Sequence, residues 1–220
     1  MQNLIEQNIK IQNKESKLCF VGVSLAESGS VETGIAIIDR DLNLLRVDKS
    51  YNLSELKSNL SSIAPAESIV ACVGMPRNMM MLNGKWRIES KLTRSFKLGN
   101  FESSKYSWTQ RFSDRGSELC KDFREEGMEV FRYNCDYTKN TLQINAPYRS
   151  RSPAACKYLQ MIIEKRLNIS GLPTNLIPLP AMNAIIGAYT AWKMATDVEN
   201  EGFKQIGVHK QIPVVSVISI

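Results

Sequence analysis

The chain has 220 residues, of which 43% are hydrophobic and 23% are charged, with 12 glycines and 8 prolines. These proportions are those of a globular protein, and they exclude a disordered chain, a collagen and a disulfide miniprotein. The 28 Lys and Arg outnumber the 22 Asp and Glu, which gives a net charge of +6, and no run approaches the roughly 18 apolar residues of a membrane span. We therefore expect one domain with no membrane partner.

The cysteines and the histidine limit the chemistry that the chain can perform. Five cysteines are scattered without a C-x-x-C pair, a pattern typical of reduced thiols in the cytosol, and we expect a cytoplasmic protein. The single histidine, His209, argues against a histidine-based catalytic triad and against a zinc site of the usual kind. We expect His209 to be a solvated turn residue, and we expect no metal and no cofactor.

The first part of the chain predicts an antiparallel meander and then a central strand. Residues 1–16 mix polar and apolar side chains and are interpreted as an arm, so the predicted domain covers residues 17–220. Residues 54–62 predict a short amphipathic helix that Pro65 ends. Apolar, β-branched segments predict strands at residues 17–24, 33–38, 44–51 and 68–73.

The rest of the chain begins with a polar, basic and aromatic insertion at about residues 77–126, in which we predict helices at 85–96 and 116–126. Beyond it we predict a fifth strand at 128–133, helices at 152–167 and 181–195, and a closing hairpin or edge strands at 203–206 and 214–220. This order predicts an α/β protein of the ribonuclease H-like fold. Its sheet would be mixed and five-stranded, with an antiparallel three-strand meander and helices on both faces.

The positive charge is concentrated in the insertion. Between residues 77 and 111, eight Lys and Arg stand against two Glu, and five aromatic residues lie among them. Basic residues interleaved with aromatic ones can neutralise phosphates and stack on bases. The candidate nucleic-acid-binding residues are Arg77, Lys85, Trp86, Arg87, Lys91, Arg94, Trp108 and Arg111. The alternative for this run, and for a second basic run at residues 139–166, is a solvated helix face whose aromatic residues belong to the core.

Four segments carry a resemblance to a known family. They are residues 20–26 (FVGVSLA) followed by 33–39 (TGIAIID), residues 69–76 (IVACVGMP), residues 84–92 (GKWRIESKL) and residues 182–191 (MNAIIGAYTA). Their order and spacing resemble the predicted-nuclease family on the ribonuclease H-like fold known as domain-of-unknown-function family 429, from about residue 18 to the C-terminus. The resemblance implies a metal-dependent phosphodiester hydrolase, in which carboxylates from two strands and a helix hold a pair of Mg²⁺ ions.

This sequence lacks the family's carboxylates. The acid of the first strand falls at Ser24, that of the fourth strand at Gly74, that of the C-terminal helix at Asn183, and that of the fifth strand at Arg132. Neutral side chains cannot balance the charge of two metal ions, so we expect these four positions to be vestigial and no catalytic residue to be retained. We also expect Ser24, Gly74 and Asn183 to lie close together.

Three functions remain open at this point. The first is a catalytically degenerate, non-catalytic binding module for nucleic acid or for a partner protein. The second is an active metal-dependent nuclease whose carboxylate ligands are relocated to Glu27, Asp39 or Asp136. The third is a protein–protein adaptor that uses the aromatic and Met-rich insertion without binding nucleic acid. The apolar C-terminal run at 214–220 would, as an exposed edge strand, also favour a homodimer.

Overall fold

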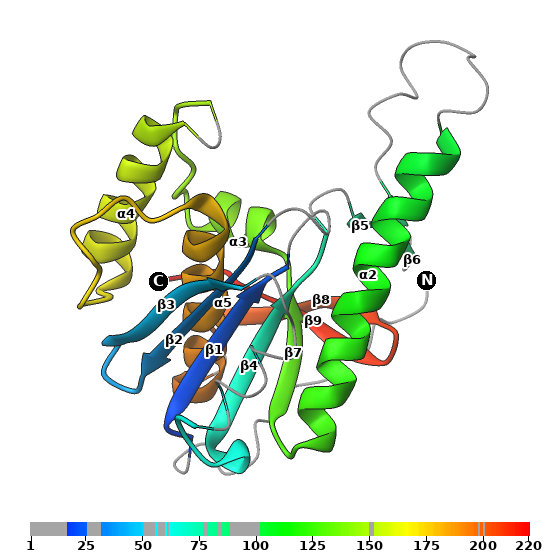
Figure 1. Cartoon of the computed structure of the whole chain (residues 1–220), viewed down its shortest axis with the longest axis horizontal. Coiled ribbons are helices and arrows are strands. Elements are labelled where there is room, and N and C mark those ends of the chain that lie inside the picture. Colours follow the sequence, from blue (N-terminus) through cyan, green and yellow to red (C-terminus); the bar gives the residue numbers. More distant parts are fainter. Residues whose placement is uncertain are drawn as a thin grey trace.

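The structure, a computed structural model, describes residues 17–25, 32–50, 56, 60, 62–76, 79–82, 85–88, 102–149, 152–197, 199 and 201–220, and for 79–82, 85–88 and 102–111 it describes the backbone alone. The described part is an α/β protein built on a seven-stranded mixed sheet (Figure 1). The strands of this sheet are β1 Cys19–Ser24, β2 Thr33–Asp39, β3 Leu44–Ser50, β4 Ile69–Gly74, β7 Glu129–Tyr133, β8 Phe203–His209 and β9 Ile212–Val217.

The strands run in the order β3-β2-β1-β4-β7-β9-β8. The pairs β1–β2 and β2–β3 are antiparallel, which is the predicted meander. Strands β1, β4, β7 and β9 are parallel neighbours, so their carboxyl ends meet at one end of the sheet. The prediction of five strands is therefore wrong, because the C-terminal hairpin extends the sheet beyond β7 by two strands.

The C-terminal run is an internal strand. Its apolar, β-branched residues form β9, which pairs with β7 on one side and with β8 on the other. Within the described part of the chain, β8 is the terminal strand at this side of the sheet. The premise that residues 214–220 offer a free edge for a homodimer is thus wrong.

Helices cover both faces of the sheet (Figure 1). The apolar residues of β1 and β4 alternate between two cores, one shared with α5 and the other with α2. Leu56 and Leu60, the two described residues of the predicted 54–62 helix, are helical and fully buried in the α2 core. The other helices described are a short 3-10 helix at Ala66–Ser68, α2 Glu102–Glu125, α3 Cys135–Thr141, α4 Pro153–Leu167 and α5 Leu179–Thr196. None of the described helices is long and apolar enough to cross a membrane.

Two strand glycines let α5 lie directly on the sheet. A Cβ atom on Gly22 would overlap the carbonyl oxygen of Ala184, and one on Gly34 would overlap that of Pro180. Gly34 is paired with Ser24 at the end of β1. The glycines therefore hold the first turns of α5 against the carboxyl end of β1.

The insertion differs from its prediction. Residues Lys85–Ile88 form strand β6, which pairs antiparallel with β5 Met79–Leu82, so the helix predicted at 85–96 is wrong for its first residues. The predicted helix at 116–126 is the C-terminal half of a longer helix, α2. Figure 1 shows the N-terminal half of α2 projecting beyond the ends of the strands.

Candidate functional site

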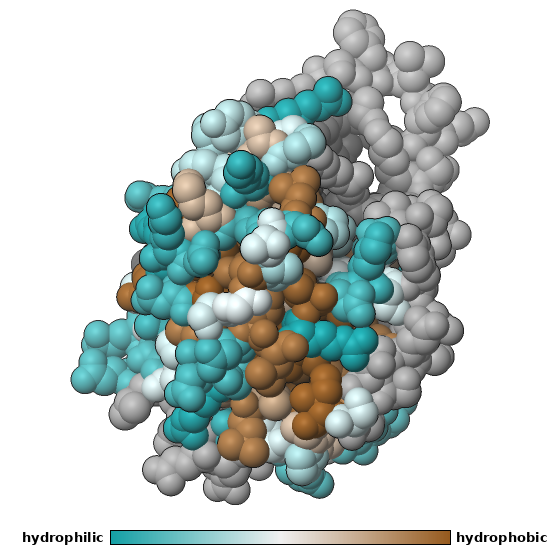
Figure 2. Space-filling model, turned by 60° about the vertical axis from the view of Figure 1, so that its left-hand side comes forward, coloured by the Kyte–Doolittle hydropathy of each residue, from teal (hydrophilic) through white to brown (hydrophobic). Residues whose placement is uncertain are grey.

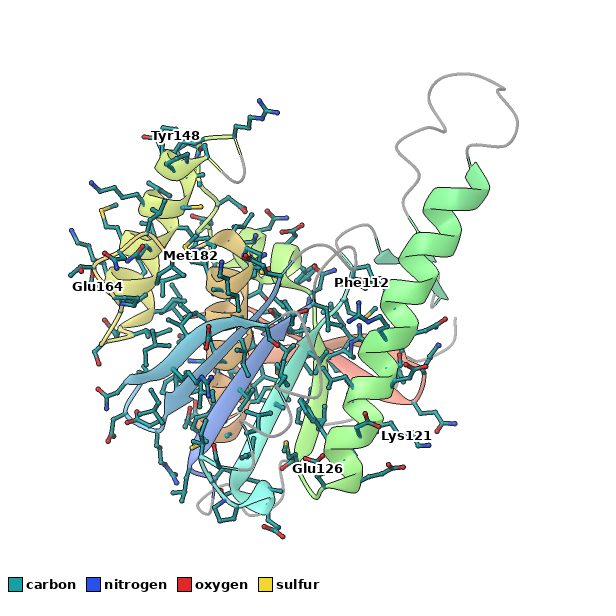
Figure 3. All side chains as sticks on the ribbon, viewed as in Figure 1. Phe112, Lys121, Glu126, Tyr148, Glu164 and Met182 are labelled. Carbon is teal, nitrogen blue, oxygen red and sulfur yellow. The ribbon has the colours of Figure 1, made fainter. Side chains whose placement is uncertain are left out.

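The structure brings Ser24, Gly74 and Asn183 together at the carboxyl ends of the parallel strands. Ser24 is the last residue of β1 and Gly74 the last of β4, and a Cβ atom on Gly74 would lie 3.8 Å from the Cα of Ser24. Asn183 lies in the first turns of α5, near Met182, which Figure 3 labels at one end of that helix. Tyr133, the last residue of β7, connects all three.

Tyr133 fills the space between these residues. Its side chain is fully buried, and its ring lies 3.6 Å from the Cβ position of Gly74. The Tyr133 hydroxyl donates to the carbonyl oxygen of Asn183 at 2.7 Å and is hydrogen-bonded to the side chain of Ser24. Because a phenol has one proton, Ser24 is the donor in the second bond. Burial raises the pKa of Tyr133 well above its usual range, so the phenol stays neutral.

An internal cation lies beside this tyrosine. The Lys139 side chain comes from α3 and is buried, and its Nζ lies 3.0 Å from Oδ1 of Asp136 and 3.3 Å from Oδ1 of Asn183. Asp136, one of the proposed relocated metal ligands, is therefore paired with an ammonium group. The Asn134 side chain caps α3 by accepting a hydrogen bond from the backbone of Tyr137 at 3.0 Å, which fixes this short helix at the end of β7. We call Ser24, Tyr133, Asp136, Lys139 and Asn183 the Tyr133 cluster.

Arg132 lies on the opposite face of the sheet, because neighbouring residues of a strand point to opposite faces. Its fully buried guanidinium donates to the carbonyl oxygens of Gly74 at 2.8 Å and Val73 at 3.1 Å. Gly116 makes room for it in α2, where a Cβ atom would lie 2.7 Å from Nη2. Arg132, interpreted from the sequence as a fourth vestigial position, thus contacts Gly74 from the other face of the sheet, and Tyr133 is the β7 residue that reaches Ser24 and Asn183.

His209 is buried on the same side as Arg132, so the expectation of a solvated turn residue is wrong. Its exposed fraction is 7%, and its Nε2 lies 3.0 Å from the hydroxyl oxygen of Ser113 in α2. Burial, Arg132 and Lys210 together lower the pKa of His209 to about 4, against an opposing contribution from Asp114. Ser113 is fully buried, so no substrate can reach its hydroxyl as a nucleophile.

The structure describes one of the two other acids that were considered as relocated metal ligands, Asp39 and Glu27. Asp39 is paired with Cys19, at the other end of β1 from Ser24, and its Oδ1 accepts hydrogen bonds from the backbone of Asp41 and Asn43 at 2.9 and 2.8 Å. Glu27 lies outside the described residues. Among the residues that the structure describes, no group of three or more His, Cys, Asp or Glu side chains could hold a metal ion.

The candidate nucleic-acid-binding residues fall into two groups. Lys85, Trp86 and Arg87 belong to β6, and Trp108 and Arg111 belong to α2, where the backbone is described. The others lie outside the described residues, and they are Arg77, Lys91 and Arg94.

The second basic run does not form one surface. Lys139 is buried in the Tyr133 cluster, whereas Lys157 and Lys165 are exposed on α4. Arg166 donates to the carbonyl oxygen of Gln143 at 3.3 Å. The α4 cations thus behave as a solvated helix face.

Sequence reasoning missed two members of the Tyr133 cluster, Tyr133 itself and Lys139. A signal for the first was available, since Gly74 ends one parallel strand and Tyr133 ends the next, and the two are paired in register. Lys139 follows Asp136 by three residues, the spacing of an ion pair on a helix.

Comparison with known proteins adds no family assignment. No family model matches the chain, and no curated protein is significantly similar to it.

Proposed function

We propose that this protein is a non-catalytic binding module of the ribonuclease H-like fold and that its ligand is nucleic acid. Five strands support the fold: β3, β2, β1, β4 and β7 are adjacent in this order, with β1 antiparallel to β2 and parallel to β4. That is the arrangement expected from the order of elements in the sequence. On this view β8 and β9 are additions at one side of the sheet.

The Tyr133 cluster is the observation that carries the non-catalytic part. Two-metal hydrolysis needs several carboxylates that converge on the ions. Here the residues at the carboxyl ends of β1, β4 and β7 present a hydroxyl, a glycine and a neutral phenol. The carboxylate of the Tyr133 cluster, Asp136, is engaged by the Lys139 ammonium. An ammonium group in that position repels a divalent cation and takes the oxygen ligands that the cation would need.

The basic insertion supports nucleic acid as the ligand. Strand β5 begins a few residues after β4 ends, so chain connectivity keeps the β5–β6 hairpin near the end of the sheet that holds the Tyr133 cluster. The excess of six positive charges between residues 77 and 111 equals the net charge of the whole chain. Clustered charge of this kind binds polyphosphates through counterion release.

Two assays test the proposal. The purified protein should bind labelled DNA or RNA at about 50 mM salt, with an affinity that falls steeply as salt is raised. It should hydrolyse neither substrate in the presence of Mg²⁺ or Mn²⁺. Metal-dependent hydrolysis that Asp136→Asn abolishes would establish the nuclease alternative. If the purified protein binds no nucleic acid at low salt, nucleic acid is not its ligand, and the protein–protein adaptor becomes the favoured function.

A further inference from the structure

The hairpin β5–β6 has two chemically different faces. The strands are joined by two residues, and the register pairs Met80 with Arg87 and Leu82 with Lys85. Cross-strand partners share a face, and successive residues of a strand alternate between faces. Lys85 and Arg87 therefore share one face of the ladder. The positions on the other face are all apolar, and they are Met79, Met81, Trp86 and Ile88.

Helix α2 likewise places Trp108 and Arg111 on different stripes of its surface. Its 24 residues span about 36 Å, and Phe112, Leu119 and Phe123 form the stripe that packs on the sheet. Trp108 lies four residues before Phe112, so it continues this stripe towards the N-terminus of the helix. Arg111 lies seven residues before the exposed Glu118. Residues seven apart share a face of a helix, so Arg111 belongs to the stripe of Glu118 and not to that of Phe112.

Single-strand binding by stacking requires aromatic rings and cations on one surface. In the hairpin, the ladder places Trp86 on the face opposite to Lys85 and Arg87. A two-stranded ribbon has the dimensions that the major groove of B-form DNA admits, whereas the major groove of A-form RNA is too narrow for it. The separation of the cations from the tryptophan thus favours a duplex over a single strand, and the dimensions of the major groove favour DNA over RNA.

We propose that the β5–β6 hairpin contacts the phosphate backbone of duplex DNA through the ladder face that carries Lys85 and Arg87, and that Trp86 takes no part in base stacking. This inference rests on the proposed function, because it names the form of nucleic acid and the element that binds it. Recognition is then independent of sequence, since phosphate contacts position a protein on DNA without reading its bases.

The test measures the salt dependence of binding to duplex DNA for Lys85→Ala and Arg87→Ala. Each change should reduce the log–log slope by about one unit and weaken binding equally for unrelated sequences. Lys121→Ala is the matched control, because Lys121 is a 76% exposed lysine near the other end of α2 (Figure 3) and should leave the slope unchanged. Thermal melting of each variant shows whether its fold is intact.

Trp86→Ala supplies the second measurement. The ratio of single-strand to duplex affinity should be the same in this variant as in the wild type, even where loss of the tryptophan weakens the hairpin. A wild type that prefers single strands, or duplex RNA, to duplex DNA would overturn the inference. A salt slope equal to that of the wild type in both Lys85→Ala and Arg87→Ala would also overturn the inference. If both variants keep the wild-type slope and the protein still binds nucleic acid, the inference fails and the proposed function remains. If the protein binds no nucleic acid at about 50 mM salt, the inference and the proposed function are both contradicted.

Discussion

At the scale of single residues, Tyr133 is the side chain that closes the end of the sheet. Its hydroxyl serves two elements at once, donating to the Asn183 carbonyl in α5 and accepting from Ser24 in β1. Removing that hydroxyl takes one hydrogen-bond partner from the half-buried Ser24 side chain and one from the carbonyl of buried Asn183, and the loss of a buried partner costs about 1–3 kcal/mol.

Tyr133→Phe should therefore lower the free energy of unfolding by about 2 kcal/mol in urea denaturation. Tyr148→Phe is the matched control, since Tyr148 is 52% exposed and its ring meets Tyr158 edge to face, a contact that phenylalanine keeps. Equal stability of the two variants would show that the Tyr133 hydroxyl does not stabilise the cluster.

His209 gives the protein a sensitivity to acid. Its pKa of about 4 in the folded protein lies below its ordinary value of 6.5, so the unfolded chain binds the extra proton between these values. The stabilisation is complete above about pH 6.5 and is lost as the pH falls towards 4. Between pH 7 and pH 5 this amounts to roughly 2 kcal/mol.

His209→Gln removes the titrating group while keeping a side chain that can hydrogen-bond to Ser113. In urea denaturation at the two pH values, the wild type should lose roughly 2 kcal/mol more than this variant on going from pH 7 to pH 5. An identical loss in both proteins would place the acid sensitivity on other groups, such as the Asp114 carboxylate that pairs with Lys210.

At the scale of elements, the docking of α5 on β1 depends on the absence of a side chain at Gly22. The obstacle to a methyl group there is the backbone of α5 at Ala184, which cannot rotate away as a side chain can. Gly22→Ala should cost about 3 kcal/mol or more, because the whole helix must move. Gly74→Ala on the neighbouring strand is the control, since its nearest obstacle is 3.3 Å away, at Val23. Melting temperatures that fall equally in both variants would contradict this account.

Several elements could be predicted because local chemistry and tertiary packing agree. Ser152 caps α4 as expected, with its hydroxyl oxygen accepting from the backbone of Ala155 at 3.1 Å. The uninterrupted apolar run of β4 is a central strand that is buried on both faces. The β5–β6 hairpin was missed although Asn83 and Gly84, the pair favoured in two-residue turns, separate its strands. The charged residues of that segment are also typical of a solvated helix face, and a helix was predicted there instead.

The site was predictable only in part, because alternation cannot assign a face when both neighbours are buried. Arg132 and Tyr133 are both fully buried, so periodicity alone gives no reason to choose between them. His209 was misplaced because a polar residue beside Lys210 is typical of a loop, whereas its partner Ser113 is distant in the sequence. Contacts of that kind arise from the packing of α2 against the C-terminal hairpin and leave no local signal.

At the scale of the whole molecule, the end of β7 carries polar clusters on both faces of the sheet. Tyr133 and Lys139 lie on the α5 side, and Arg132 with His209 lies on the α2 side. The side with α4, α5 and the C-terminus shows apolar side chains bordered by polar ones in Figure 2. Within the described part of the chain, β8 is the terminal strand next to β9, so pairing between two copies at that edge of the sheet would use β8 and not β9.

Divalent metal should leave the stability of the whole protein unchanged. A ligand that binds only the folded state raises the melting temperature by mass action, and at about a hundred times its Kd it adds about 2.7 kcal/mol. The Tyr133 cluster offers Mg²⁺ or Mn²⁺ one carboxylate, Asp136, and that carboxylate is held by Lys139. Addition of Mg²⁺ or Mn²⁺ should therefore produce the same melting temperature as KCl at matched ionic strength. A metal-specific rise that Asp136→Asn abolishes would show that the ammonium yields its place to a metal ion, and it would restore the nuclease alternative.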